Sequence, residues 1–172
     1  MTKRLIALLM GLSLVFSLSA CGGDKNEDDT TNSPSSEETT LSISEGSGLK
    51  DIYDKCTEKM PEMIALDADM MLNYCGIKAE DCAEFYVSIC ADSLRTDEIW
   101  LIKAKDATAL KTLSDLATAR LKAKGDESIT YSPEQYEVVQ KAKVVTKGDY
   151  FALLVSPDAA ALEAIVNEGI AD

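Results

Sequence analysis

The chain has 172 residues, of which 30 are acidic and 17 basic, and its formal net charge is −13. It has five cysteines and no histidine, so a Ser–His–Asp triad, a Cys–His pair and a His-ligated zinc site are excluded within one chain. The length fits one domain with appendages, and the acidic balance argues against a nucleic-acid partner, because phosphates are bound by Lys and Arg surfaces.

The first 20 residues predict a targeting segment. Lys3 and Arg4 precede an apolar run over residues 5–18, which is shorter than the roughly 20 residues of a membrane-spanning helix. The run ends in Leu18-Ser19-Ala20-Cys21, which resembles the lipobox of bacterial lipoproteins. The resemblance implies cleavage before Cys21 and lipidation of its thiol, which would anchor the chain at the extracytoplasmic face of the membrane. An ordinary signal peptide cleaved after residue 20 is the alternative.

Residues 21–48 comprise the lipidated Cys21 and a predicted linker. Residues 22–48 contain seven acids, one lysine, many Ser and Thr and no aromatic residue. Because such a segment cannot bury enough apolar surface to offset its ordering entropy, we expect a disordered tether that spans roughly 30 Å. Apolar periodicity returns over residues 49–172, which predict a single globular domain.

Apolar residues at helical spacing predict the first helix of that domain over residues 49–60. Residues 63–77 fit either a second helix or a strand. Alternation of apolar and polar residues predicts a strand over residues 84–91. The next predicted strand covers residues 98–105 and turns Trp100 toward the core.

The second half of the domain predicts three helices and a hairpin. A helix over residues 106–124 is expected to end at Gly125, and the next helix opens at Ser132-Pro133. Strands over residues 142–146 and 150–156 form the hairpin, and the last helix follows them. This order predicts an α+β fold whose antiparallel sheet has about four strands, in two hairpins, with helices packed mainly on one face.

Residues 50–168 also resemble a family of bacterial lipoproteins and exported proteins, typical of Clostridia-like anaerobes, whose shared domain has no known function. The resemblance implies no activity, cofactor or catalytic residue that could be carried over. It rests on short motifs: Tyr74-Cys75-Gly76-Ile77, the Glu98-Ile99 strand, the helix with Arg120, Tyr131-Ser132-Pro133 and Gly148-Asp149-Tyr150.

The cysteines of the domain allow three interpretations. Cys56, Cys75, Cys82 and Cys90 contain no C-x-x-C pair, so buried reduced thiols are one interpretation. One disulfide that involves Cys75 or Cys82 is the second, although a single strand over residues 82–90 would hold its ends about 26 Å apart, beyond any bridge. A thiol-dependent enzyme or a metal site that uses Cys75, Cys82 or Cys90 is the third.

Two further side chains are candidates for ligand contact. Arg120 lies at the edge of the apolar stripe of its helix, where its planar fork could bind an anionic ligand or pair with a neighbouring acid. Tyr131 precedes a helix cap and could line a groove or lie at the rim of the core.

We therefore expect a monomeric, membrane-anchored lipoprotein at the cell surface. Its domain is predicted to be a non-enzymatic binding or accessory module for a protein or cell-wall partner, with no catalytic residues, metal, cofactor or nucleic acid. The alternative is the thiol-dependent enzyme or metal-binding protein that uses Cys75, Cys82 or Cys90.

Overall fold

The structure is a computed structural model that describes residues 48–170. The predicted targeting segment, the lipidation site Cys21 and residues 22–47 of the predicted linker lie outside the described residues. The described elements, in chain order, are α1 (Gly48–Thr57), β1 (Met63–Ala65), α2 (Ala68–Cys75), the short 3-10 helix η1 (Ala79–Asp81), β2 (Cys82–Cys90), β3 (Glu98–Ala104), α3 (Ala107–Tyr131), α4 (Pro133–Gln140), β4 (Lys143–Lys147), β5 (Tyr150–Val155) and α5 (Ala159–Gly169).

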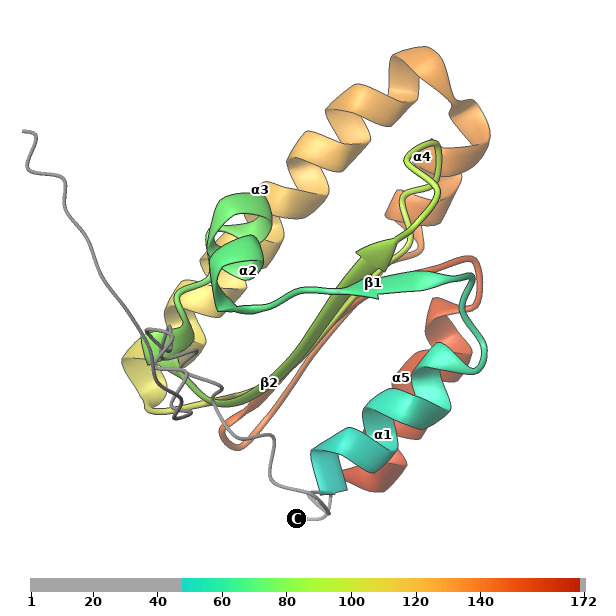
Figure 1. The fold of residues 1–172 in the computed structure, drawn as a ribbon. Coiled ribbons are helices and arrows are strands. Elements are labelled where there is room, and N and C mark those ends of the chain that lie inside the picture. Colours follow the sequence, from blue (N-terminus) through green and yellow to red (C-terminus); the bar gives the residue numbers. More distant parts are fainter. Residues whose placement is uncertain (1–47, 171–172) are drawn as a thin grey trace, which may run out of the picture. The chain divides into compact units, whose positions relative to one another are not determined.

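The strands form one antiparallel sheet in the order β1-β2-β3-β5-β4 (Figure 1). The α+β class and both predicted hairpins are confirmed, and the hairpins join through β3 and β5, where Glu98 lies opposite Val155. The sheet has five strands instead of about four, because β1 adds to the free edge of β2, with Ile64 opposite Ile89. Three residues are too few for an alternating pattern to be recognised in the sequence.

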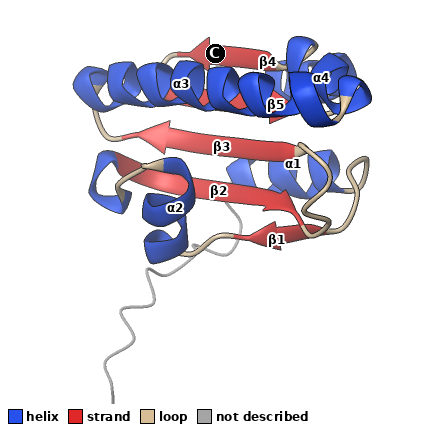
Figure 2. Ribbon diagram, turned by 90° about the horizontal axis from the view of Figure 1, so that it is seen from above, coloured by secondary structure: helices blue, strands red, loops and turns tan. Residues whose placement is uncertain are grey.

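Helices cover both faces of the sheet, which corrects the prediction of helices mainly on one face. Ile99 and Leu101 of β3 pack in the core cluster that includes α1 and α5, whereas Trp100 and Ile102 pack in the cluster that includes α2, α3 and α4. Figure 2 shows α2 and α3 on the near face and α1 behind the sheet. The central strand is apolar on both faces, so burial of both faces requires a second helical layer.

The long helix α3 differs from its predicted end. Asp106 caps its start, where the side chain accepts a 2.8 Å hydrogen bond from the Ala109 amide. The predicted stop at Gly125 is wrong, since the helix continues for six more residues. Gly125 is buried under α4, and a Cβ built on it would lie 3.7 Å from Tyr136 and 3.9 Å from Val139. Packing against α4 therefore holds this glycine within the helix.

The ambiguous stretch over residues 63–77 contains both kinds of element. After β1, Asp67 caps α2 by accepting a 2.8 Å hydrogen bond from the Met70 amide. Gly76 ends α2 in the left-handed conformation, with φ of 73°, and its N–H donates to the Leu72 carbonyl. The short helix brings Cys75 close to Glu98 of β3 and the carbonyl group of Tyr74 close to Arg120 of α3.

Candidate functional site

A carboxylate is buried at the start of the central strand. Glu98 is the first residue of β3, its side chain is fully buried, and it lies on the same strand face as Trp100. That face is covered by α3. A carboxylate removed from water at this depth is stable only if charges and hydrogen bonds of the protein replace its hydration.

Four donors surround the two carboxylate oxygens. Trp100 Nε1 donates to Oε1 at 2.7 Å, and Lys124 Nζ lies 2.8 Å from Oε2. Arg120 contacts both oxygens at 3.1 Å through Nε and donates to Oε2 at 2.9 Å through Nη2. The Cys75 Sγ atom lies 3.6 Å from Oε1. We name these five residues, Glu98, Trp100, Arg120, Lys124 and Cys75, the Glu98 cluster.

The helical repeat of α3 explains how two cations reach one acid. Arg120 and Lys124 are four residues apart, so they lie one above the other on the same face of the helix. Each also binds a backbone carbonyl elsewhere: Arg120 Nη1 donates to Tyr74 at 3.0 Å, and Lys124 Nζ donates to Thr96 at 3.0 Å. The cluster therefore connects α2, the loop before β3, β3 itself and α3.

The electrostatics keep the buried carboxylate ionised. Burial alone raises the pKa of Glu98, but the charge of Lys124 and the hydrogen bonds and charge of Arg120 outweigh burial and lower this pKa below its ordinary value. Burial likewise lowers the pKa of Arg120, and the contact with Glu98 more than restores it. At neutral pH Glu98 is thus a charged acceptor surrounded by donors, and it holds no proton for general acid catalysis.

The four cysteines of the described residues are free thiols. Within residues 48–170 no disulfide involves Cys75 or Cys82. Burial, followed by the charge of Glu98, raises the pKa of Cys75 to about 12, and burial raises the pKa values of Cys56 and Cys82 to about 11. Because the thiolate is the nucleophile and the metal ligand, these values argue against a reactive thiol or metal ligand at Cys75 or Cys82.

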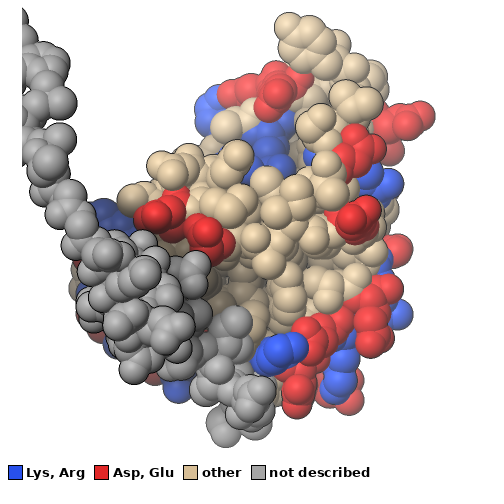
Figure 3. Space-filling view, in the orientation of Figure 1, with Lys and Arg blue, Asp and Glu red and all other residues tan. Residues whose placement is uncertain are grey.

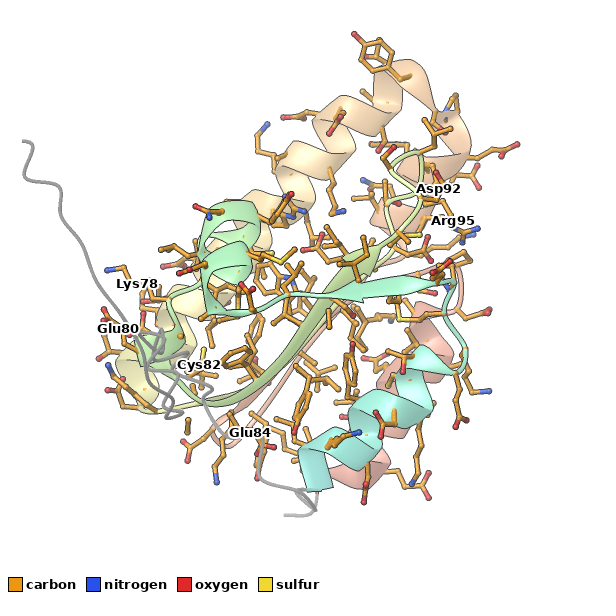
Figure 4. The ribbon with its side chains drawn as sticks, viewed as in Figure 1. Lys78, Glu80, Cys82, Glu84, Asp92 and Arg95 are labelled. Atoms are coloured by element: carbon orange, nitrogen blue, oxygen red, sulfur yellow. The ribbon has the colours of Figure 1, made fainter. Side chains whose placement is uncertain are left out.

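Other polar groups lie at the two ends of β2, away from one another. Figure 4 shows Lys78, Glu80 and Cys82 together at the end where β2 begins, and Asp92 and Arg95 beyond its other end. Lys78 lies 3.8 Å from Glu80, and the Cys82 thiol lies 3.6 Å from the Lys78 carbonyl oxygen. Neither group forms a set with the geometry of a catalytic site.

Buried Asp97 is the second acid at the start of β3. Its Oδ2 atom accepts a 2.9 Å hydrogen bond from Arg95 Nε. Its Oδ1 atom has no hydrogen-bond partner within the described part of the chain.

The structure separates the two residues that the sequence offered for ligand contact. Arg120 belongs to the Glu98 cluster, where it pairs with an acid, as one of its two interpretations expected. Tyr131 is 85% exposed at the far end of α3, about 16 Å along the helix axis from Arg120. Sequence reasoning missed Glu98 and Lys124 as members of a site. The signal that could have found Lys124 is its spacing of four residues from Arg120 on one helix.

Residues 48–170 contain neither a candidate metal site nor a helix that could span a membrane. No group of three His, Cys, Asp or Glu side chains there could hold a metal ion. No helix in this part of the chain is long and apolar enough to cross a membrane.

Residues 48–170 also form two open depressions of about 320 and 330 Å³. The first is lined by residues such as Lys141 and Pro157, and the second by residues such as Leu72 and Glu80. Neither is lined by a member of the Glu98 cluster.

Residues 55–156 match a family described as a domain of unknown function, DUF4358. The chain belongs to this family. The matched range holds all five strands and the whole Glu98 cluster, but it ends before α5 and begins within α1. No curated protein and no solved structure matched the chain in the same comparisons. Membership in the DUF4358 family therefore assigns the domain and no activity.

Proposed function

We propose that this protein is a lipoprotein, anchored through Cys21 at the extracytoplasmic face of a bacterial membrane, whose DUF4358 domain is a non-enzymatic binding module. The observation that carries the proposal is the sequence around Cys21. A basic start, a short apolar run and Leu18-Ser19-Ala20-Cys21 follow one another in the order and spacing of a lipoprotein signal. Acylation on more than one position would make such an anchor stable.

The composition that follows Cys21 supports a tethered domain. Residues 22–48 carry seven acids and one lysine, so anionic lipid headgroups would repel them. A tether of this length and charge would hold the domain near the membrane but clear of its surface.

The chemistry of the domain supports binding in preference to catalysis. Glu98 accepts hydrogen bonds from side chains of its own chain, and its lowered pKa removes it as a proton donor at neutral pH. The raised pKa values of Cys56, Cys75 and Cys82 leave these thiols protonated. The Glu98 cluster therefore joins structural elements of the described residues and contains no activated nucleophile.

Labelling with radioactive palmitate in bacterial cells tests the anchor. Wild-type protein should carry the label and sediment with membranes, and Cys21→Ala should lose the label. Cys82→Ala is the matched control, because it also removes one thiol but should keep the label. An unlabelled wild-type protein, or a Cys21→Ala variant that is labelled as well as the wild type, would contradict the proposal.

A further inference from the structure

The Glu98 cluster contains more positive than negative charge. One carboxylate faces two cations, and the Lys124 side chain is only 13% exposed. Other ion pairs of the domain are balanced, with one cation facing one acid, as in Lys105–Asp81 and Lys111–Asp115. A largely buried lysine that shares its acid with a second cation is unusual, because buried lysines are normally paired.

Several donors of this cluster remain unused. Arg120 has five N–H groups, of which Glu98 and the Tyr74 carbonyl take three. The Lys124 ammonium group has three N–H groups, of which Glu98 and the Thr96 carbonyl accept two. Within residues 48–170 no further acceptor contacts these two side chains. Two donors of the guanidinium and one of the ammonium group are therefore available to another molecule.

The Glu98 cluster reaches the surface of the domain at Arg120. The Arg120 side chain is 26% exposed, and the side chain of neighbouring Tyr74 is 54% exposed. Figure 3 shows basic side chains in the upper middle of this face, with acidic side chains directly above them and uncharged residues below. The charge of Glu127 also acts on Arg120 and raises its pKa, but no ion pair joins these two side chains.

We propose that Arg120, at the partly exposed edge of the Glu98 cluster, and Lys124 beside it bind the carboxylate group of a small organic acid. A single negative charge balances the cluster, and a planar carboxylate matches the guanidinium fork. Residues 49–172 hold 23 acidic and 14 basic residues, so their net charge of −9 disfavours anions of higher charge. The exposed side chain of Tyr74 offers contact to an organic group. The inference names a ligand class for the proposed binding module and rests on that proposal.

Trp100 provides a direct readout of this site. It is the single tryptophan of the chain, and its indole N–H donates to the same carboxylate that Arg120 and Lys124 hold. The full chain, purified in mild detergent, is titrated with benzoate at constant ionic strength while the fluorescence and the indole N–H resonance of Trp100 are followed. We expect a saturable shift with benzoate and none with benzamide, which is a neutral molecule of the same shape.

Two lysine variants separate a ligand site from a structural ion cluster. Lys124→Met keeps the balanced pair of Glu98 and Arg120, so this variant should fold. It should bind benzoate at least about tenfold more weakly, because a lost hydrogen bond to a charged group usually has an effect of this size. Lys122→Met is the matched control, because Lys122 pairs with Asp126 on the exposed side of the same helix and its loss should leave binding unchanged.

Three results would overturn the inference. They are the absence of a saturable shift in wild-type protein, an equal shift in Lys124→Met, and a response to inorganic phosphate as strong as that to benzoate. None of these results bears on palmitate labelling at Cys21. Failure of the carboxylate site is thus distinguishable from failure of the proposed anchor.

Discussion

Trp100 Nε1 donates a 2.7 Å hydrogen bond to Glu98 Oε1, and both side chains are fully buried on the α3 face of the sheet. The two residues lie two positions apart on β3, so they share one strand face. Since the chain has one tryptophan, indole fluorescence reports the state of a single buried carboxylate. This relationship makes the stability of the Glu98 cluster measurable without any added probe.

Removal of the carboxylate should destabilise the domain strongly. Glu98→Ala would leave the two cations of the cluster without their shared acid, and we expect the free energy of unfolding to fall by about 3–5 kcal/mol. Urea denaturation followed by Trp100 fluorescence measures the change. Asp115→Ala is the control, because it breaks an exposed pair with Lys111 and should cost less than about 1 kcal/mol. Equal effects of the two variants would contradict a stabilising role for the cluster.

The same carboxylate predicts a loss of stability in acid. The pKa of folded Glu98 lies below its ordinary value of 4.5, so the unfolded chain binds this proton first as the pH falls. The contribution of Glu98 should be complete at neutral pH, begin to fall near pH 4.5 and disappear as the pH passes the lowered pKa. The difference in unfolding free energy between wild type and Glu98→Gln should shrink over this range.

The Trp100 indole resonance tests the same titration without a variant. Its chemical shift at neutral pH should persist below pH 4.5 for as long as the protein stays folded. Titration of this resonance above pH 4.5 would show that the pKa of Glu98 is raised, contrary to the expectation.

The buried thiols should be unreactive in the folded protein. Because the pKa values of Cys56, Cys75 and Cys82 are raised to between about 11 and about 12, little thiolate exists at pH 7.5. Iodoacetamide should leave these residues unmodified in native protein and alkylate all of them in urea, as read by peptide mass spectrometry. Rapid alkylation of Cys75 in the native protein would contradict this expectation and support a thiol-dependent function.

Two glycines should respond in opposite ways to alanine. Gly125→Ala should raise the free energy of unfolding by about 0.5–1 kcal/mol, because the residue lies inside α3 and a methyl group there meets its neighbours at ordinary contact distance. Gly76→Ala should lower it by about 1–2 kcal/mol, since φ of 73° is strained for any residue with a Cβ. Thermal denaturation of both variants and of the wild type measures the two changes in stability. A destabilised Gly125→Ala would show that α4 packs too closely for a methyl group.

The sequence predicted those elements whose pattern is long enough to be periodic. Alternation over residues 84–91 and 98–105 identified β2 and β3, and Ser132-Pro133 marked the start of α4. Gly125 gave the wrong end for α3, because a tertiary contact with α4 overrides the usual preference of glycine for a helix end. The second helical layer was missed although Ile99 and Leu101 are apolar, since local periodicity does not say what covers a strand face.

The Glu98 cluster could not be predicted from the sequence for a different reason. Glu98 is one of 30 acids, and nothing in its local sequence shows that it is fully buried. Its partners Arg120 and Lys124 are more than 20 residues away, and the sheet and α3 bring them together only in the folded domain. Arg120 could be singled out by its place beside an apolar stripe, but its partner could not be identified.

The mass of the mature N-terminal peptide tests the lipoprotein account most directly. After purification from bacterial membranes and digestion, we expect residues 1–20 to be absent. The first peptide should begin at Cys21 and carry the added mass of a diacylglyceryl group. A mature chain with an unmodified thiol at Cys21, or one that retains residues 1–20, would show that this protein is not a lipoprotein anchored at Cys21.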